Sequence, residues 1–201
     1  MNTDSKSTQS RSGATFVIGM LGCCVAVALW YSTGKNGLPA GPPDYRNLVL
    51  KNAQGKNVSL AEYDGRPVML HFFTTWCDQC QAMAQDLAAT SQTMSNEVQI
   101  IGVSLDLLPD FQLDDAHFEP ESRLEEVKTF LTKHHVDYPV LYDRSGACAD
   151  ALQGRQVPAQ VVFDSNMKLL RRFTGERSVE GLRAILQACV NEDRAQQSPR
   201  P

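Results

Sequence analysis

One stretch of this 201-residue chain decides its fold: residues 68–80, with the sequence VMLHFFTTWCDQC. Its first six residues are apolar or aromatic except for His71 and follow a Gly-Arg-Pro turn signal, so they predict a buried strand. The residues that come next are good helix formers, with Met83 and Leu87 four positions apart on one helix face. The pattern therefore predicts a strand, a tight junction at Cys77 and then a helix.

Cys77 and Cys80 are the chemically reactive residues at this junction. The free backbone N–H groups and the positive end of the helix dipole favour the thiolate of Cys77, which is the attacking species in disulfide exchange. Cys80 follows one turn later, close enough to close a disulfide onto Cys77. A structural zinc site would need four ligands, and the chain has no second CxxC and no Cys/His pair at finger-like spacing. We therefore expect no metal and no cofactor other than the redox-active disulfide itself.

The N-terminal part of the chain contains a candidate membrane anchor. Residues 14–31 are almost wholly apolar or small, and at about 1.5 Å per residue they would just cross the hydrocarbon core of a bilayer. Lys6 and Arg11 precede this segment. The positive-inside bias therefore places residues 1–13 in the cytoplasm and the rest of the chain outside it.

Two alternatives to a membrane anchor stay open. A cleaved signal peptide would have a shorter apolar core ending in small residues, whereas this segment ends in Leu29-Trp30-Tyr31, with an aromatic pair that suits a membrane interface. The tripeptide Leu21-Gly22-Cys23 also resembles a lipoprotein acylation site. Against acylation, the apolar run continues for several residues beyond Cys23.

The rest of the chain has the composition of a soluble globular domain. Hydrophobic residues make up 42% and charged residues 21% of the chain, and its net charge of −4 argues against a nucleic-acid partner. Residues 32–46 are dense in Gly and Pro and predict a tether. We expect residues 47–192 to form the folded domain and residues 193–201 a polar, flexible tail.

Hydrophobic periodicity predicts strands that alternate with helices. The expected strands cover residues 48–50, 58–60, 68–73, 98–104, 139–142, 160–163 and 169–174, and the expected helices cover residues 77–91, 123–134, 147–152 and 179–191. The first two strands form a small hairpin, and Ser178 is the expected N-cap of the last helix. This order predicts an α/β fold with helices on both faces of a mixed sheet, which is the thioredoxin-like arrangement with an N-terminal β-hairpin extension.

The motifs of five segments occur together in one known family. They cover residues 44–60, 63–67, 71–80, 102–106 and 157–164. In these segments the chain resembles the TlpA/ResA/DsbE-like family of membrane-anchored thioredoxin-fold proteins. The resemblance implies a thiol-disulfide oxidoreductase of the protein-disulfide reductase type, anchored in the bacterial cytoplasmic membrane with its catalytic domain on the periplasmic side. It also implies partners: protein disulfides, such as those of apocytochromes c or copper-site proteins, and a membrane electron-donor protein.

The resemblance assigns roles to individual residues. Cys77 and Cys80 are the implied catalytic pair, and Pro158 follows a cis peptide bond that faces them. A cis X-Pro bond would keep a backbone edge next to Cys77, where an extended substrate peptide can pair while the mixed disulfide exists. Trp76 and Val157 are expected to contact that substrate. From sequence alone, Pro158 could equally be a trans residue that opens a strand.

Three residues near the dithiol tune it or depart from the family pattern. His71 stands where the family usually has asparagine, and we hypothesise that it is the proton acceptor for Cys80, since histidine titrates near neutrality. Alternatively it is a core histidine that bonds a backbone carbonyl. Met83 replaces a glutamate that is common in the family. The carboxylate of Asp78 should raise the pKa of Cys77 and make the pair a reductant. Alternatively, its negative charge only complements the positive N-terminal end of the helix dipole.

Two further features have no role in the resemblance. Residues 105–122 contain six acidic residues and no Lys or Arg. We expect a solvated acidic loop there, with a docking surface for a basic partner or a weak metal site as alternatives. Cys148 and Cys189 are expected to be buried free thiols, although a second disulfide stays open.

Two other functions fit part of the pattern. A peroxiredoxin-like peroxidase shares the fold and a Thr-x-x-Cys pattern, which residues 74–77 satisfy, but it would have a proline where Leu70 stands. An SCO-like copper chaperone would need cysteines three residues apart and a distant ligand histidine. His117, His134 and His135 are weak candidates for that ligand.

Overall fold

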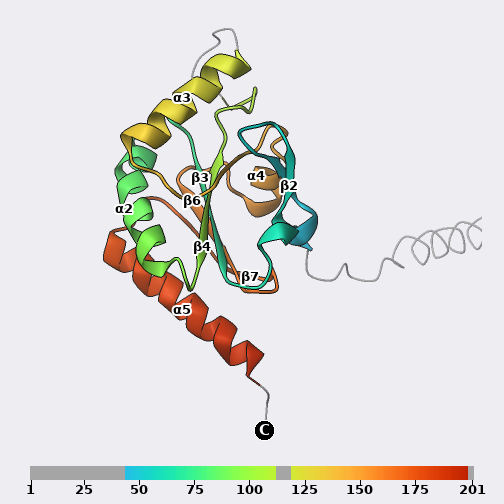
Figure 1. Cartoon of the computed structure of the whole chain (residues 1–201), viewed down its shortest axis with the longest axis vertical. Coiled ribbons are helices and arrows are strands. Elements are labelled where there is room, and N and C mark those ends of the chain that lie inside the picture. Colours follow the sequence, from blue (N-terminus) through green and yellow to red (C-terminus); the bar gives the residue numbers. More distant parts are fainter. Residues whose placement is uncertain (1–43, 112–118, 199–201) are drawn as a thin grey trace, which may run out of the picture. The chain divides into compact units, whose positions relative to one another are not determined.

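The computed structural model describes residues 44–111 and 119–198 (Figure 1). The predicted cytoplasmic segment, the candidate anchor and Cys23 lie outside these residues, as does the tether up to residue 43. Among the described residues, no helix is both long and apolar enough to cross a membrane. The anchor and its orientation therefore stay predictions.

The described residues form one mixed sheet in the strand order β2-β1-β5-β4-β3-β6-β7. The strands are β1 (Val49–Lys51), β2 (Asn57–Ser59), β3 (Val68–Phe73), β4 (Gln99–Ser104), β5 (Val140–Tyr142), β6 (Ala159–Phe163) and β7 (Leu169–Thr174). The helices are α2 (Asp78–Met94), α3 (Pro120–Lys133), α4 (Ala147–Leu152) and α5 (Val179–Gln197), with short 3-10 helices η1 (Tyr45–Asn47) and η2 (Leu60–Tyr63). Strands β5, β4 and β3 run parallel, while β6, β7 and the β1–β2 hairpin pair antiparallel. The predicted thioredoxin-like sheet and its hairpin extension are confirmed.

Strand β3 is the centre of the sheet, and every one of its residues is buried. Its side chains alternate between the faces, so Met69 and Phe73 pack under α2 and α3, while Leu70 and Phe72 pack on the opposite face with α4. Figure 1 shows α2, α3 and α5 on one side of the sheet and α4 on the other. A strand covered on both faces explains why this segment is a continuous apolar run rather than an alternating one.

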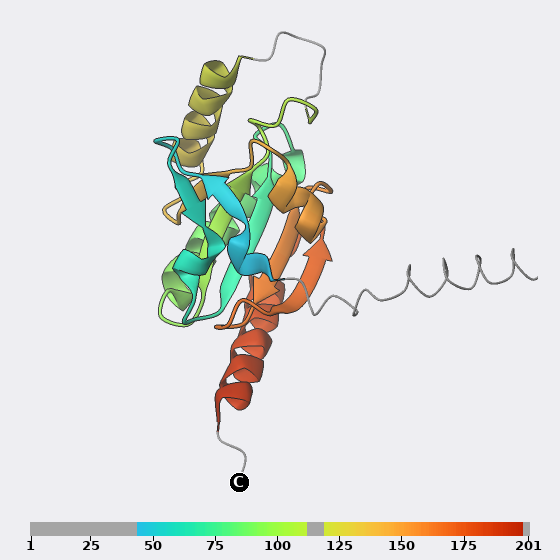
Figure 2. The same cartoon turned by 90° about the vertical axis from the view of Figure 1, so that its right-hand side faces the viewer.

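The face with α4 also carries the hairpin. Figure 2 shows the β1–β2 hairpin and α4 turned toward the viewer. Here the backbone of Gly154, after α4, touches the ring of Phe72: a Cβ at position 154 would lie 2.6 Å from the ring atom Cγ. This close approach brings the segment before Pro158 against β3.

The folded domain is longer at both ends than the sequence indicated. Tyr45, in the expected tether, is buried and packs on Phe163 with 5.5 Å between ring centroids. Helix α5 continues to Gln197, whereas a flexible tail was expected from residue 193. Asp193 is buried, and its carboxylate accepts hydrogen bonds from the backbone N–H and hydroxyl of Ser165 at 2.9 and 2.7 Å. This contact between residues far apart in the sequence holds the last turn of α5 on the domain.

Cys148 and Cys189 are buried free thiols, as expected. Cys148 belongs to the core on the α4 face, and Cys189 belongs to the core between α2 and α5 on the other face. Burial raises the pKa of both thiols. Neither therefore forms a thiolate readily, and the sheet separates them.

We expect Gly154→Ala to destabilise the protein by about 1–3 kcal/mol, because its methyl group would overlap the Phe72 ring in a filled core. Gly181→Ala is the matched control: the added Cβ lies 3.5 Å from Ser178 Oγ, an ordinary contact, and alanine favours a helix by up to about 1 kcal/mol. Urea unfolding of both variants measures the difference. Equal stabilities would show that the domain accommodates a side chain at position 154 without cost.

Candidate active site

The site is built at the junction of β3 and α2, where Cys77 is the N-cap of the helix. Cys77 and Cys80 form a disulfide, and the backbone N–H of Cys80 donates to Cys77 Sγ at 3.2 Å. Cys77 is partly exposed, whereas Cys80 is fully buried. An exposed sulfur at a helix N-terminus suits nucleophilic attack on a partner, and a buried second sulfur suits the intramolecular step that follows.

Asp106 anchors the loop that leads into the disulfide. Its Oδ1 accepts hydrogen bonds from the backbone N–H and hydroxyl of Thr75 at 2.9 and 2.6 Å, and its Oδ2 accepts one from Ser104 at 2.9 Å. Burial raises the pKa of Asp106, and the hydrogen bonds from Thr75 and Ser104 oppose that rise. Sequence reasoning placed Asp106 in a solvated acidic loop, which is wrong: Asp106 is 1% exposed, and Leu105, Leu107 and Leu108 beside it are buried.

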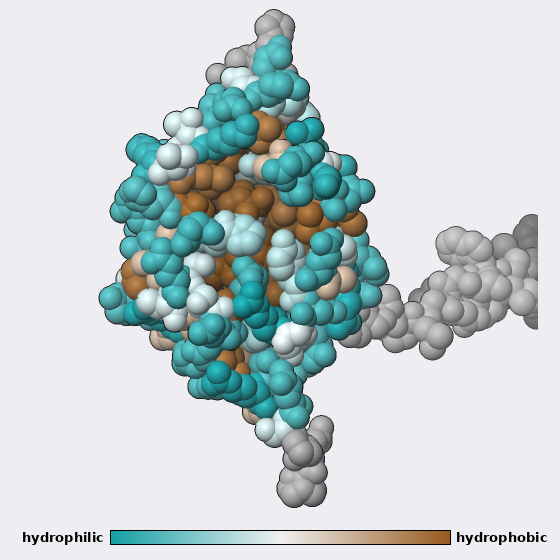
Figure 3. Space-filling view, viewed as in Figure 1, coloured by the Kyte–Doolittle hydropathy of each residue, from teal (hydrophilic) through white to brown (hydrophobic). Residues whose placement is uncertain are grey.

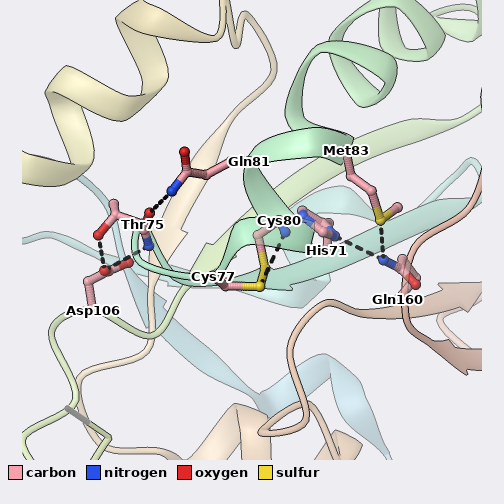
Figure 4. The surroundings of a disulfide bond; sticks show 8 residues. All are labelled: His71, Thr75, Cys77, Cys80, Gln81, Met83, Asp106 and Gln160. Atoms are coloured by element: carbon pink, nitrogen blue, oxygen red, sulfur yellow. Dashed lines mark hydrogen bonds between the residues drawn. A yellow bond between two sulfur atoms is a disulfide. The ribbon is translucent and has the colours of Figure 1, made fainter. Parts of the chain in front are cut away.

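His71 lies on β3 within a small buried polar cluster (Figure 4). Its Nδ1 is 3.2 Å from Nε2 of Gln160, which sits directly opposite on β6. The same Nε2 is 3.7 Å from Sδ of Met83, one turn after Cys80 on α2. In the view of Figure 4 the His71 ring lies between Cys80 and Gln160. Histidine here bonds a glutamine side chain rather than the backbone carbonyl that the alternative interpretation supposed.

The hydrogen bonds of Gln160 decide which His71 nitrogen carries the proton. With its NH₂ toward His71 and Met83, Gln160 uses its N–H groups on two acceptors, and Oε1 has no hydrogen-bond partner among the described residues. With the amide turned over, Oε1 would face the sulfur of Met83, so two acceptors would meet. The orientation in the structure avoids that contact. His71 therefore accepts at Nδ1 and carries its proton on Nε2.

Burial also keeps His71 neutral. The ring is 2% exposed, and desolvation lowers the pKa of His71 to about 3. The expectation that this histidine titrates near neutrality is therefore wrong, because no negative group compensates for the lost hydration. A neutral ring with Nε2–H is a hydrogen-bond donor on its free side.

The other predicted site residues gather around the disulfide. The Val157-Pro158 peptide bond is cis, as the resemblance implied, and Pro158 leads directly into β6. Val157 and Cys77 pack against the same apolar cluster as Cys80. Trp76 is partly buried and packs on Phe111, with 5.8 Å between ring centroids. Asp78 is exposed in the first turn of α2, and its effect on Cys77 stays a prediction.

Sequence reasoning missed Asp106 and Gln160. A signal existed for Asp106: Thr75 and Asp106 follow adjacent parallel strands, whose carboxyl ends meet at one edge of the sheet. For Gln160 the signal was a lone polar residue inside an apolar strand, which needs a partner when buried. No group of three or more His, Cys, Asp or Glu side chains is placed to hold a metal in the part of the chain that the structure describes.

Comparison with known proteins places the site in a family context. The model of the AhpC/TSA family matches residues 44–172. The thiol-disulfide oxidoreductase ResA of Bacillus subtilis is 24% identical over 164 residues, which cover 80% of this chain and 83% of ResA.

Solved structures share the fold. One is a putative thiol:disulfide interchange protein DsbE from Chlorobium tepidum, with a TM-score of 0.60, 20% identity, and coverage of 74% of this chain and 96% of that one. Another is a secreted Mycobacterium tuberculosis disulfide oxidoreductase homologous to E. coli DsbE, with a TM-score of 0.57, 20% identity, and coverage of 73% and 99%.

His71 should make the oxidised protein less stable in acid. Between pH 6.5 and about 3 the unfolded chain binds a proton that the folded His71 does not, so the free energy of unfolding falls as the pH falls. At pH 5 this loss is about 2 kcal/mol relative to pH 8. We expect His71→Asn to lack this part of the dependence in urea unfolding at the two pH values. The measured quantity is the difference between variants, because His134 also has a lowered pKa. Identical pH dependence in both proteins would contradict the assignment.

Nitrogen-15 NMR should find the proton of His71 on Nε2. Replacing Gln160 with Leu removes the donor to Nδ1, so we expect the two neutral tautomers of His71 to mix and its ring nitrogen shifts to converge. The exposed His135 serves as the internal control and should keep its shifts. A proton on Nδ1 in the unsubstituted protein would show that the Gln160 amide is oriented the other way.

Proposed function

Because this chain belongs to the AhpC/TSA family and is a thiol-disulfide oxidoreductase of the ResA/DsbE type, we propose that it reduces disulfides in partner proteins. The observation that carries the proposal is the disulfide at the start of α2, with one cysteine partly exposed and the other fully buried. Redox activity of this pair, without another cofactor, is part of the proposal.

The reaction starts from the reduced pair. The Cys77 thiolate attacks one sulfur of the partner's disulfide, a Cys77–partner disulfide forms, and the partner's second sulfur leaves as a thiolate. Cys80 then attacks the Cys77 sulfur, the Cys77–Cys80 disulfide closes, and the partner's first sulfur leaves as a thiolate. Two electrons pass to the partner, and an electron-donor protein at the membrane must restore the dithiol.

Asp78 supports the reductive direction. Its carboxylate follows Cys77 directly, so it should oppose a negative charge on that sulfur and raise the pKa of Cys77. A less stable reduced thiolate makes the couple a stronger reductant.

His71 and Gln160 are proposed to act on the second step. Cys80 must lose its proton in a fully buried place, and the thiolate that the partner released in the first step is the base that takes it. The neutral His71 ring offers a donor at Nε2. A hydrogen bond from that N–H, directly or through water, would stabilise the Cys80 thiolate. Gln160 is then a positioning residue, since it occupies Nδ1 and thereby keeps the proton on Nε2.

Val157, Pro158 and Trp76 are proposed to hold the substrate. Val157 packs on the same cluster as Cys77, so an extended peptide joined to Cys77 would meet the backbone there. Trp76 flanks Cys77 on its N-terminal side.

The proposed location is outside the cytoplasm, with residues 14–31 as the anchor. The apolar run in the sequence supports an anchor. A structural relative described as a secreted disulfide oxidoreductase supports the extracytoplasmic side. Apocytochromes c and copper-site proteins are proposed as partner classes on the resemblance alone.

A peroxiredoxin-like peroxidase is the second candidate, favoured by the match to the AhpC/TSA model. Leu70, where a peroxidase would carry proline, lies in the core on the face of β3 opposite the dithiol. For an SCO-like copper chaperone, nothing in the described residues brings a histidine and both cysteines together as ligands. Peroxide turnover or stoichiometric copper retention would support these alternatives.

We expect Cys77→Ser to abolish the reduction of insulin, because Ser cannot form the mixed disulfide. Cys80→Ser should instead accumulate a covalent Cys77–substrate complex, visible by mass spectrometry, because the resolving thiol is missing. Cys189→Ala, at a buried free thiol on α5, is the control and should retain activity. Insulin reduction that survives Cys77→Ser would rule out the proposed mechanism.

The reduction potential of the Cys77–Cys80 pair should lie nearer to about −270 mV than to about −120 mV, the value of a strong oxidant.

A further inference from the structure

Arg155 connects two chain segments near the dithiol and has no part in the mechanism above. It lies between α4 and β6, two residues before Val157. Its guanidinium donates two hydrogen bonds to the carboxylate of Asp150 on α4 and a third, from Nη1, to Oδ2 of Asp110 at 3.2 Å. Asp110 lies in the loop after β4, 45 positions earlier in the chain. The Arg155 side chain therefore links its own segment to a loop that is distant in the sequence.

Both the side chain and the main chain of Arg155 are held in place. Its Nη2 lies against the backbone of Gly146, the N-cap of α4: a Cβ at position 146 would be 2.5 Å from that atom. Its carbonyl oxygen accepts a hydrogen bond from the backbone N–H of Val157 at 3.1 Å. A shift of the guanidinium would therefore be transmitted to Val157, the residue directly before Pro158.

Asp110 belongs to the segment that supports Trp76. Phe111, the next residue, packs its ring on Trp76 with 5.8 Å between ring centroids. The backbone N–H of Phe111 donates to the carbonyl oxygen of Leu108 at 3.1 Å, and Leu108 is buried. The ion pair between Asp110 and Arg155 thus joins the support of Trp76 to the segment that contains Arg155.

Apolar contacts alone do not fix the spacing of these two segments. Figure 3 shows hydrophobic residues gathered in the middle of the face beside α3, with hydrophilic residues around them. Phe111 and Val157 both pack against the hydrophobic core on the α4 face. Hydrophobic attraction is non-directional, so it keeps both side chains buried but tolerates small shifts along the core. A hydrogen-bonded ion pair has a preferred distance and direction and can fix the spacing.

The exposure of the ion pair indicates positioning rather than stabilisation. The side chain of Arg155 is 33% exposed and that of Asp110 is 67% exposed. An ion pair this exposed contributes little to the free energy of unfolding. Without Asp110, the guanidinium would keep its two hydrogen bonds to Asp150. The segment before Val157 would then stay in place on α4 but lose its connection to the loop after β4.

We propose that Arg155 is a positioning residue for polypeptide substrates: through Asp110 it fixes the spacing between Trp76 and Val157. The proposal rests on the function proposed above and deepens it, because Trp76 and Val157 are residues that would hold the substrate. An extended polypeptide joined to Cys77 has to meet both contacts at once, whereas a small disulfide needs only the sulfur. A spacing that is fixed in advance lowers the cost of binding the polypeptide.

Alanine substitution of Asp110 tests the proposal in the full-length protein. Asp110→Ala should raise the KM for insulin about threefold at unchanged kcat, an effect of the size that an exposed ion pair can supply. Turnover of bis(2-hydroxyethyl) disulfide, which has no polypeptide, corrects for changes at the dithiol. The measured quantity is the ratio of kcat/KM for insulin to that for the small disulfide.

Asp137→Ala is the matched control. Asp137 is exposed like Asp110, and it accepts a hydrogen bond from Gln92, which is also 45 positions away in the chain. It lies outside both segments that Arg155 connects. The ratio should therefore stay at the wild-type value in Asp137→Ala.

Arg155 provides the second arm. Arg155→Met keeps an unbranched side chain but removes all three hydrogen bonds, so the ratio should fall at least as far as in Asp110→Ala. Adding Asp110→Ala to Arg155→Met should lower the ratio no further, because both substitutions break the same pair. Asp110→Glu keeps a carboxylate and should recover part of the loss. Additive effects of the two substitutions would show that the residues act separately and would contradict the proposal.

The outcomes separate the two proposals. Wild-type protein that reduces neither disulfide would overturn the proposed function, and the positioning role of Arg155 with it. Wild-type protein that reduces both, with the same ratio in Asp110→Ala as in Asp137→Ala, would overturn the positioning role alone. An equal loss for insulin and for the small disulfide leaves the ratio unchanged and overturns it as well, because such a loss lies at the dithiol.

Discussion

The hydrogen bonds between Thr75 and Asp106 hold the short loop in which the central strand β3 ends and helix α2 starts. Strand β3 ends at Phe73 and α2 begins at Asp78, so four residues carry the chain from the sheet into the helix. Asp106 follows the adjacent parallel strand β4 and reaches across to Thr75. The positions of Cys77 at the helix N-terminus and of Trp76 just before it both depend on the hydrogen bonds between Thr75 and Asp106. The carboxylate is buried, and hydrogen bonds to Thr75 and Ser104 offset part of its desolvation.

A second constraint is the burial of polar side chains in the core near the dithiol. His71, Gln160 and the sulfur of Met83 lie in a core that is otherwise apolar, and Gln160 Oε1 has no partner. A leucine at position 71 or 160 would pack without leaving a buried polar atom unbonded. Sequences that keep such groups in a core do so where chemistry needs them, and here Met83 lies one turn after Cys80 on α2, while His71 lies on the strand that leads into the dithiol. A neutral donor there can favour a thiolate without adding a titrating charge at neutral pH, since burial keeps the pKa of His71 at about 3.

The sequence was sufficient for everything that depends on local pattern. The strand before Cys77, the helix after it, the order of elements and the N-terminal hairpin follow from periodicity and turn residues, because those signals lie within a few positions of each other. Asp106, Gln160 and Asp193 were missed for a common reason. Each is a polar residue whose partner lies about 30 to 90 positions away in the chain, so the local pattern marks at most a polar position and does not show which residue pairs with it.

The difference in exposure between Cys77 and Cys80 determines at which step of the reaction the protein can distinguish one partner from another. Cys80 is fully buried, so its attack on the mixed disulfide is intramolecular and differs little from one partner to another. Discrimination must therefore come before that step, from contacts made while the partner approaches Cys77 or is joined to it. The backbone edge that we propose at Pro158 would recognise any extended chain, because main-chain pairing carries no side-chain information. With such an edge, selectivity would come from which protein disulfides can present an extended segment to it, rather than from the reactivity of their sulfurs.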